Sequence, residues 1–487
     1  MKVVLINPPL VGQVNDFMGH VPFQPVSLLY LAASLRAAGI SVEVVDCFAE
    51  ARESQAGFSR NLSLRGLWGE ALLDRIPGDA SLIGISCLFG VQHSMVVHLI
   101  ARIKERYPAP VVVGGDHATI VAPEFIAAGA DFAVRGEGER VLPALAKALG
   151  SPERLSQIPG LVGKDFDNGP PVPIRDLDAL PFPAYDLLDL PAYWEFGDAH
   201  GPLVGPYLDM ITSRGCPYGC NFCASPALSG RRWRARSAAG VVEEMAHFHR
   251  TLGVTDFHIQ DANYTVNRKR ALEIAQGILA AGLPVTYSLP CGIKGETIRP
   301  EDLDILAASG LHYLSLAPES GSQRMLGLMN KKMDFQHMFD LVARAKALGL
   351  NTAASFIIGY PGETDQDRMM TLRLVRRMTR AGVDEFAVFI MTPLPGAKAA
   401  ELFPPVDYDG MCVTPRWRED FEDLAQWRRR ILTAFFLAKL RWFPGRMLMH
   451  LVNVARGKGT VKGELVARRA VRLRLRSLAS RFTRTHS

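Results

Sequence analysis

Three cysteines lie close together in the stretch Cys216-Pro-Tyr-Gly-Cys220-Asn-Phe-Cys223, which follows the apolar run Leu208–Ile211. Three thiolates at this spacing can bind three irons of a four-iron cluster and leave the fourth iron without a protein ligand. A disulfide would leave an odd thiol in the group, and a structural zinc site needs a fourth ligand that no second cysteine pair supplies. The motif therefore predicts a [4Fe-4S] cluster with one open iron, at which chemistry can take place.

The motif, with the aromatic Phe222 before its last cysteine, resembles the signature of the radical S-adenosylmethionine (SAM) superfamily. The resemblance implies that Cys216, Cys220 and Cys223 hold the cluster and that SAM binds the open iron. One electron, supplied to the cluster by an external donor, then cleaves SAM to methionine and a 5′-deoxyadenosyl radical, which takes a hydrogen atom from the substrate. Phe222 is expected to cover the cluster, and the alternative is an ordinary core aromatic.

The first 150 residues alternate short apolar runs with helical patterns. Such runs are typical of parallel strands that are buried on both faces, so this part predicts a doubly wound, Rossmann-like α/β sheet. The expected strands are residues 3–6, 42–45, 82–86, 110–113 and 132–134. Sheets of this kind bind ligands at the carboxyl ends of their strands. A dinucleotide is not expected, because no G-x-G-x-x-G follows the first strand.

This part of the chain resembles the cobalamin-binding domain that precedes the radical SAM domain in one branch of the superfamily. The resemblance implies that cobalamin contacts the strand ends and the turns after them, at Asn7, Pro8, Ser86, Gly114, Gly115, Asp116, Gly136 and Glu137. Some cobalamin domains supply a histidine to cobalt from the motif Asp-x-His-x-x-Gly, which is absent from residues 1–150. His20, His93 and His117 are therefore interpreted as structural histidines.

Residues 151–205 are rich in proline, which disfavours regular helix, and are expected to form an irregular linker. Residues 206–400 repeat the strand–helix alternation and predict a partial (β/α)6 barrel of the TIM type. The expected strands are residues 208–212, 256–260, 285–289, 313–317, 353–358 and 385–391. Chemistry in such barrels takes place at the carboxyl ends of the strands. The cysteine motif follows the first strand and so lies at that end.

Later strand ends match radical SAM segments that bind SAM. The resemblance implies contacts to its methionine part from Asp261 and Asn263, to its ribose from Glu319 and Ser320, and to its adenine from Gly359 and Gly362. Cys291 ends the third strand and is a candidate catalytic residue that returns a hydrogen atom to a substrate radical. The alternative is that Cys291 is a small buried hydrophobic residue.

Residues 401–487 are expected to form a basic, helical extension. From Arg428 to Ser487, sixteen Lys or Arg stand against Glu464 alone, so the preceding part is acidic although the whole chain carries +6. An apolar helical face (Val471, Leu475, Leu478, Phe482) lies beside a basic one (Arg469, Arg472, Arg476). This helix either contacts anionic lipid or caps the acidic domains. Nucleic acid is not expected, because no nucleic-acid module is recognisable.

These features predict a cobalamin-dependent radical SAM enzyme. The first hypothesis is a C-methyltransferase that acts through methylcobalamin and a 5′-deoxyadenosyl radical on an unactivated carbon of a small-molecule or lipid-like substrate. The alternatives are a non-methylating relative, such as an oxidative cyclase of the magnesium-protoporphyrin ester type or a ring-rearranging enzyme, and a cobalamin sensor or carrier. Neither a signal peptide nor a transmembrane-length apolar run is present, so a cytoplasmic location is expected, at the inner face of the membrane if the tail binds lipid.

Overall fold

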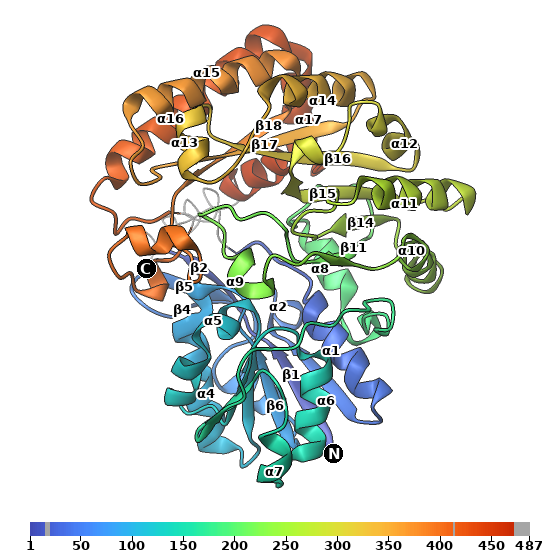
Figure 1. The fold of residues 1–487 in the computed structure, drawn as a ribbon, viewed down its shortest axis with the longest axis vertical. Coiled ribbons are helices and arrows are strands. Elements are labelled where there is room, and N and C mark those ends of the chain that lie inside the picture. The colour runs from blue at the N-terminus through green and yellow to red at the C-terminus, as the bar shows by residue number, and fades with distance from the viewer. Residues whose placement is uncertain (15–19, 413, 472–487) are drawn as a thin grey trace, which may run out of the picture.

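The computed structural model describes residues 1–14, 20–412 and 414–471, and Figure 1 shows two α/β units that follow each other along the chain. The first unit has a seven-stranded sheet of order β10-β9-β8-β7-β6-β1-β3. Its parallel part is made of β1 (Lys2–Asn7), β3 (Ser41–Asp46), β6 (Leu82–Ser86), β7 (Val111–Gly114) and β8 (Phe132–Val134). These are the five strands that the apolar runs predicted.

Helices cover both faces of this sheet, as a doubly wound fold requires. Alternate residues of β1 explain why: Val3 and Leu5 pack with one set of helices, and Val4 and Ile6 pack with the other. The first set is α1 (Val26–Ala37) and α6 (Gly138–Ala148), and the second is α3 (Glu70–Arg75), α4 (His93–Arg106) and α5 (Asp116–Ala127). The short α2 (Cys47–Glu50) follows β3.

The structure differs from the expected irregular linker over 151–205. In that region β9 (Leu161–Gly163) and β10 (Phe166–Asp167) add two antiparallel strands to the first sheet, beside the helices α7 (Pro152–Leu155) and α8 (Leu190–Phe196). A small antiparallel sheet, absent from the sequence prediction, joins β2 (Leu10–Gln13), β5 (Leu62–Arg65) and β4 (Gln55–Gly57). These strands are too short to give a readable apolar pattern.

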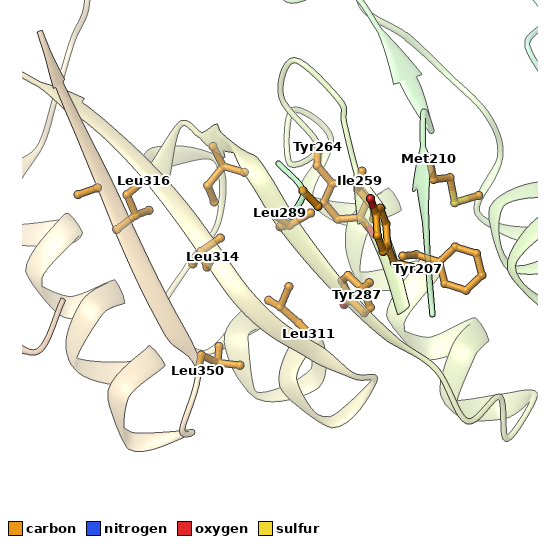
Figure 2. Packing of buried hydrophobic residues seen from close by; sticks show 14 of the residues in the cluster. Tyr207, Met210, Ile259, Tyr264, Tyr287, Leu289, Leu311, Leu314, Leu316 and Leu350 are labelled. Atoms are coloured by element: carbon orange, nitrogen blue, oxygen red, sulfur yellow. The ribbon is translucent and has the colours of Figure 1, made fainter. Parts of the chain in front are cut away.

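The second unit is a six-stranded parallel sheet of order β11-β14-β15-β16-β17-β18, which is the predicted partial barrel. Its strands are β11 (Tyr207–Met210), β14 (Asp256–Ile259), β15 (Thr286–Ile293), β16 (Leu311–Glu319), β17 (Asn351–Ile358) and β18 (Glu385–Ile390). The helices between them are α10 (Ala238–Leu252), α11 (Arg268–Ala280), α12 (Asp302–Ala308), α13 (Gln323–Leu328), α14 (Phe335–Ala347) and α15 (Asp365–Ala381). Figure 2 shows how Ile259, Leu289 and Leu314 from neighbouring strands fill the core between sheet and helices.

The C-terminal part contributes α16 (Phe421–Trp442) and α17 (Pro444–Arg456), which Figure 1 shows beside the barrel. Leu424, Trp427, Ile431 and Phe435 of α16 are buried in the same core as the barrel strands. The helix is therefore part of the barrel's packing rather than a separate tail. None of the helices in the described residues is long and apolar enough to cross a membrane.

The predicted amphipathic helix falls mostly outside the described residues. Leu475, Leu478 and Phe482 lie there, as do Arg472 and Arg476. Arg469 is described, and its Nε lies 2.5 Å from Asp198 Oδ2. This contact agrees with the cap interpretation for that residue.

Candidate active site

The cysteine loop lies between two short strands that follow β11. These are β12 (Ser213–Arg214) and β13 (Arg234–Ala235), which pair antiparallel, with α9 (Ser225–Ser229) before the second. Gly215 opens the loop with φ +81°, and a Cβ atom there would lie 2.3 Å from the Arg232 carbonyl oxygen. Only glycine fits this position without moving the backbone. All three cysteines are half-buried thiols.

The segment after α13 fixes the loop from the other side of the barrel mouth. Asn221 N donates to Met329 O (2.9 Å), and Asn330 Nδ2 donates to Gly219 O (2.7 Å). Phe222, within the loop, packs in a cluster with Met325 and Met329 and is partly buried there. The structure thus brings the first and fourth strand ends of the barrel together around the thiols.

Glu319 has the most unusual backbone of the predicted SAM contacts. It ends β16 with φ +60°, which a non-glycine residue adopts only under constraint from its surroundings, and such residues gather at functional sites. Its carboxylate is buried and pairs with Lys331 Nζ at 2.8 Å. Lys331 Nζ also lies 5.9 Å from the Phe222 ring centroid, so the pair stands directly beside the cysteine loop.

The other predicted SAM contacts divide into two groups. Gly359 and Gly362 have φ of +75° and +82°, and both lie in the turn between β17 and α15. Ser320 and Asp261 instead face protein: Ser320 is fully buried against Thr371, and Asp261 accepts three 2.6 Å hydrogen bonds from Thr212 and Ser213. Asn263 accepts from Thr265 within its own turn. These three side chains shape the loops around the site.

The predicted cobalamin contacts lie at one edge of the first sheet. Asn7, Ser86 and Gly114 end neighbouring parallel strands, and Pro8 directly follows the first of them. Gly115 has φ +114°, and a Cβ atom there would lie 2.6 Å from the Cys87 carbonyl oxygen. Asp116 begins α5, and burial raises its pKa. Gly136 follows β8 and donates its N–H to Thr119 Oγ1. The edge faces the second unit in Figure 1.

Glu137 joins the two units rather than standing free at this edge. Its carboxylate accepts from both Nη atoms of Arg234 (2.9 and 2.7 Å), and Arg214 Nη2 lies 2.5 Å from Glu139 Oε1. Burial acts to raise the pKa of Glu137, but the hydrogen bond from Arg234, the charges of Arg214 and Arg234 and the bond from the Ile174 N–H together lower that pKa. Because Arg214 and Arg234 belong to β12 and β13, these ion pairs hold the cysteine loop against the first sheet. The sequence analysis did not identify either arginine as a functional residue.

The histidines of the first unit have protein partners. His93 Nδ1 lies 3.0 Å from His117 Nε2, and the Tyr408 ring stands 4.4 and 4.8 Å from the two imidazole centroids. Burial lowers the pKa of His117 to about 4, so its imidazole is neutral at pH 7. His20 Nε2 lies 3.0 Å from Ser63 O. These contacts agree with the structural role expected from the sequence.

Cys291 lies on the inner face of the barrel, and its side chain is exposed to solvent. This exposure differs from the alternative of a small buried hydrophobic residue, and the catalytic role of Cys291 stays a prediction. The β15–β16 register breaks between Leu289 and Ile293, and this bulge redirects Cys291. Its Sγ donates to Gln260 Oε1 at 3.0 Å. Protein crowds the thiol closely enough that burial raises its pKa to about 12.

A family model of the radical SAM superfamily matches residues 210–399, and a model of the B12 binding domain matches residues 20–146. The chain belongs to the cobalamin-binding radical SAM superfamily. Its radical SAM domain contains the three cysteines and Glu319, and its B12-binding domain contains Ser86, Gly115 and Gly136. The chain is thus a radical SAM enzyme whose cofactors are a [4Fe-4S] cluster, SAM and cobalamin.

Several curated relatives of this radical SAM enzyme span most of its length. An uncharacterised methyltransferase of Pyrococcus horikoshii is 29% identical over 86% of this chain and 86% of its own. A cytidylyl-2-hydroxyethylphosphonate methyltransferase of Streptomyces wedmorensis is 28% identical over 82% of this chain and 80% of its own. A hopanoid C-3 methylase of Methylococcus capsulatus (25% identity, 82% of this chain) and an anaerobic magnesium-protoporphyrin IX monomethyl ester cyclase of Cereibacter sphaeroides (29% identity, 54% of this chain) also match.

The fold is similar to that of a solved radical SAM methyltransferase, TsrM from Kitasatospora setae, which was determined with cobalamin and a [4Fe-4S] cluster bound. The TM-score is 0.64 and the identity 20%, with 82% of this chain and 73% of that chain covered. At this identity the likeness shows that the two chains share a fold.

The thiols fit a cluster better than a single metal ion. Within residues 1–14, 20–412 and 414–471, no three His, Cys, Asp or Glu side chains converge as the ligands of one ion would. In a cubane each thiolate binds a different iron, so the sulfurs stand further apart. Burial raises the pKa of Cys216, Cys220 and Cys223, and the nearby ammonium of Lys331 acts against this effect on all three. A positive charge at this place favours thiolate ligands.

Proposed function

We propose that this enzyme transfers a methyl group to an unactivated carbon of a small-molecule or lipid-like substrate. The observation that carries the proposal is the clamp of Glu137 and Glu139 with Arg214 and Arg234, which holds the cobalamin-binding strand ends against the cysteine loop. When bound, cobalamin supplies the methyl group, and the cluster with SAM supplies the radical that removes hydrogen from the substrate. Both functions are needed at one substrate carbon, so the two units must be held together.

The protein's own residues orient the groups and limit the water around them. Lys331 places positive charge beside the thiols and pairs with Glu319. Gln260 Nε2 donates to Asp209 Oδ1 at 2.7 Å, and the backbone N–H of Gln24 donates to Asp209 Oδ2 at 3.1 Å. Gln24 belongs to the first unit, so these hydrogen bonds connect the first unit to the inner face of the barrel. The electron donor for the cluster is a partner that the proposal requires.

Two other functions remain as alternatives. An oxidative cyclase is favoured by the magnesium-protoporphyrin ester cyclases among the relatives, although the match to the Cereibacter protein covers 54% of this chain against 86% for the Pyrococcus methyltransferase. A cobalamin sensor or carrier would have no use for three half-buried thiols beside a strained Glu319. Methyl transfer accounts for both units at once.

The mass of the product distinguishes these functions. With SAM carrying an isotopically labelled methyl group, the reduced and anaerobic enzyme should convert one component of a cell extract into a product heavier by one labelled methyl group. A cyclase or a ring-rearranging enzyme would give a product without the label, and a sensor would give no product. An unlabelled product formed together with 5′-deoxyadenosine would contradict methyl transfer while leaving the radical chemistry in place.

We propose in addition that α16 and α17 contact the inner face of a membrane, where a lipid-like substrate is found. No residue of α17 is buried, and its half-buried Arg446 and His450 pair with Asp384 and Glu464. Exposed apolar side chains therefore gather on these two helices, namely Phe436, Leu437, Leu440, Trp442, Leu448, Met449, Leu451 and Val452. Exposed Arg441, Arg456 and Lys458 accompany them. An apolar surface with basic neighbours suits anionic lipid.

Vesicle sedimentation tests this contact. The wild-type chain should sediment with anionic vesicles at low salt, and replacing Leu437, Leu440, Leu448 and Leu451 with serine should weaken binding at least ten-fold, because each apolar side chain contributes on the order of 1 kcal/mol. Val172→Ser is the matched control, since Val172 is equally exposed (63%) but lies far from the C-terminal helices in the sequence. Equal sedimentation of the wild type and the quadruple variant would contradict the membrane contact.

A further inference from the structure

The barrel has an open side, because its first strand β11 and last strand β18 do not pair. Residues 457–471, here called the closing segment, bind to both edges of this gap. Leu203, just before β11, donates its N–H to Gly459 O at 2.6 Å. At the opposite edge Glu385, the first residue of β18, accepts from Lys462 N (3.2 Å) and Gly463 N (2.5 Å). The closing segment therefore takes the place of the missing strands.

The closing segment sends one cationic side chain to the inner face of the barrel. Lys462 Nζ donates to Pro290 O in the middle of β15 at 2.8 Å and lies 5.8 Å from the ring centroid of Tyr313 in β16. Among the described residues this amine has no ion-pair partner, although the charge of the Glu385 carboxylate acts on it from further away. Burial lowers the pKa of Lys462, and the negative charge of Glu385 acts against this effect without outweighing it.

Pro290 precedes Cys291, so the amine and the exposed thiol share one short stretch of the inner face. Cys291 lies in the bulge whose Gly292 has φ +86°. Gln260 Oε1, which accepts from Cys291, also lies 3.0 Å from His200 Nδ1. Burial lowers the pKa of His200, so this imidazole is neutral. The inner face at this point therefore carries a thiol, an amide, a neutral imidazole and an ammonium.

The acidic groups near Cys291 already have protein partners. Asp209 accepts from Gln24 and Gln260, and Asp261 accepts from Thr212 and Ser213. Burial raises the pKa of both carboxyl groups. Lys462 is therefore the charged group at this place that still has donors for a ligand, since an ammonium has three N–H bonds and one of them is used by Pro290.

We propose that Lys462 is a substrate-binding residue and that its ammonium group binds an oxyanion of the substrate, a carboxylate or a phosphate, beside Cys291. The inference rests on the proposed function only in taking the inner face of the barrel as the place where the substrate binds. It assigns a role to the closing segment: this segment completes the barrel and also selects an acidic substrate. An oxyanion at Lys462 would give this half-buried amine an ion-pair partner in direct contact, which it does not have among the described residues.

Alkylation of Cys291 measures the charge selectivity of this place without any catalysis. The full-length protein with its cluster assembled is treated with iodoacetate, an oxyanion, or with iodoacetamide, its neutral analogue, and modification of the Cys291 peptide is followed by mass spectrometry. Both reagents attack the same thiolate, so the ratio of their rates does not depend on the thiol pKa. Relative to a neutral free thiol in the same tube, the ratio at Cys291 should favour iodoacetate about three- to ten-fold.

Variants separate Lys462 from the rest of the closing segment. Lys462→Met should abolish the preference, Lys462→Arg should keep it, and Lys458→Met should leave it unchanged, because Lys458 is exposed in the same segment. A wild-type ratio equal to that of the free thiol would overturn the proposal even if Lys462→Met failed to fold, and so would complete protection of Cys291 from both reagents. Failure of methyl transfer in the labelling experiment would leave this result untouched, so the two proposals fail separately.

Discussion

Replacing Cys216, Cys220 or Cys223 with alanine should abolish the cleavage of SAM while leaving the chain folded. Each thiolate binds a different iron, so the loss of one leaves the cluster with two protein ligands and a second open iron. The loop itself is held by Asn221, Asn330 and Gly215 rather than by the thiols, so its fold does not depend on them. The measurements are iron content, the visible absorbance of the cluster, and 5′-deoxyadenosine formed under reducing and anaerobic conditions.

Cys412→Ala is the matched control for these variants. Cys412 is also half-buried but lies in the segment that follows the barrel, so its loss should change neither iron content nor SAM cleavage. Circular dichroism reports whether each variant is folded. Formation of 5′-deoxyadenosine by a folded protein that lacks all three cysteines of the loop would refute the assignment of the cluster ligands.

The parallel strands of both sheets could be predicted because each is a short, mostly apolar run between two helical patterns. The predicted strand at 353–358 lies within β17 (Asn351–Ile358), and the predicted strand at 385–391 matches β18 (Glu385–Ile390) to within one residue. The short strands β9 and β10 could not be predicted in the same way, since two or three residues carry no period. The strand β9 follows from pairing with β8, a contact between distant residues that a local pattern does not contain, and β10 then pairs with β9.

The site residues likewise fall into those that a local motif reveals and those that depend on distant partners. The cysteine spacing and Glu319 were visible because their chemistry is local, and the structure places them side by side. Glu137 reads as a turn residue at a strand end, but its partners Arg214 and Arg234 stand 77 and 97 positions away and mark it as part of the clamp. The role of the closing segment could not be predicted either, because its partners are also distant in the sequence. Its basic residues predicted a C-terminal extension, whereas Lys462 reaches into the barrel.

The C-terminal helices α16 and α17 are anchored to the barrel by a buried charge. Asp384 lies at the start of the last barrel strand, is almost fully buried, and receives Lys439 of α16 and Arg446 of α17. Arg446 Nη1 is 2.5 Å from Asp384 Oδ1, and Lys439 is 1% exposed. Truncation after Asp420 would remove both cations together with the buried face of α16. We therefore expect such truncation to unfold the barrel rather than only to release the protein from lipid.

Asp384→Ala should destabilise the packing of α16 on β18 by about 3–5 kcal/mol, because it leaves Lys439 buried without a counter-charge. Burial already lowers the pKa of Lys439, and Asp384 is the charge that opposes this effect most strongly. Arg446 is less buried and can turn to water. Hydrogen exchange in α16 and β18 measures the local opening free energy, which is preferable to global unfolding in a chain of several units.

Two further variants show whether the effect of Asp384→Ala comes from the buried ion pair or from the loss of any carboxylate. Asp304→Ala breaks a pair with Arg344 in which both side chains are more than two-fifths exposed, so it should cost less than about 1 kcal/mol. Lys439→Met added to Asp384→Ala should recover much of the loss, since an apolar side chain needs no counter-charge in that position. The contrary result would be equal hydrogen-exchange protection of α16 in Asp384→Ala and in the wild type. Lys439 would then have to reach water when Asp384 is absent, and the anchoring of α16 and α17 by this buried charge would be wrong.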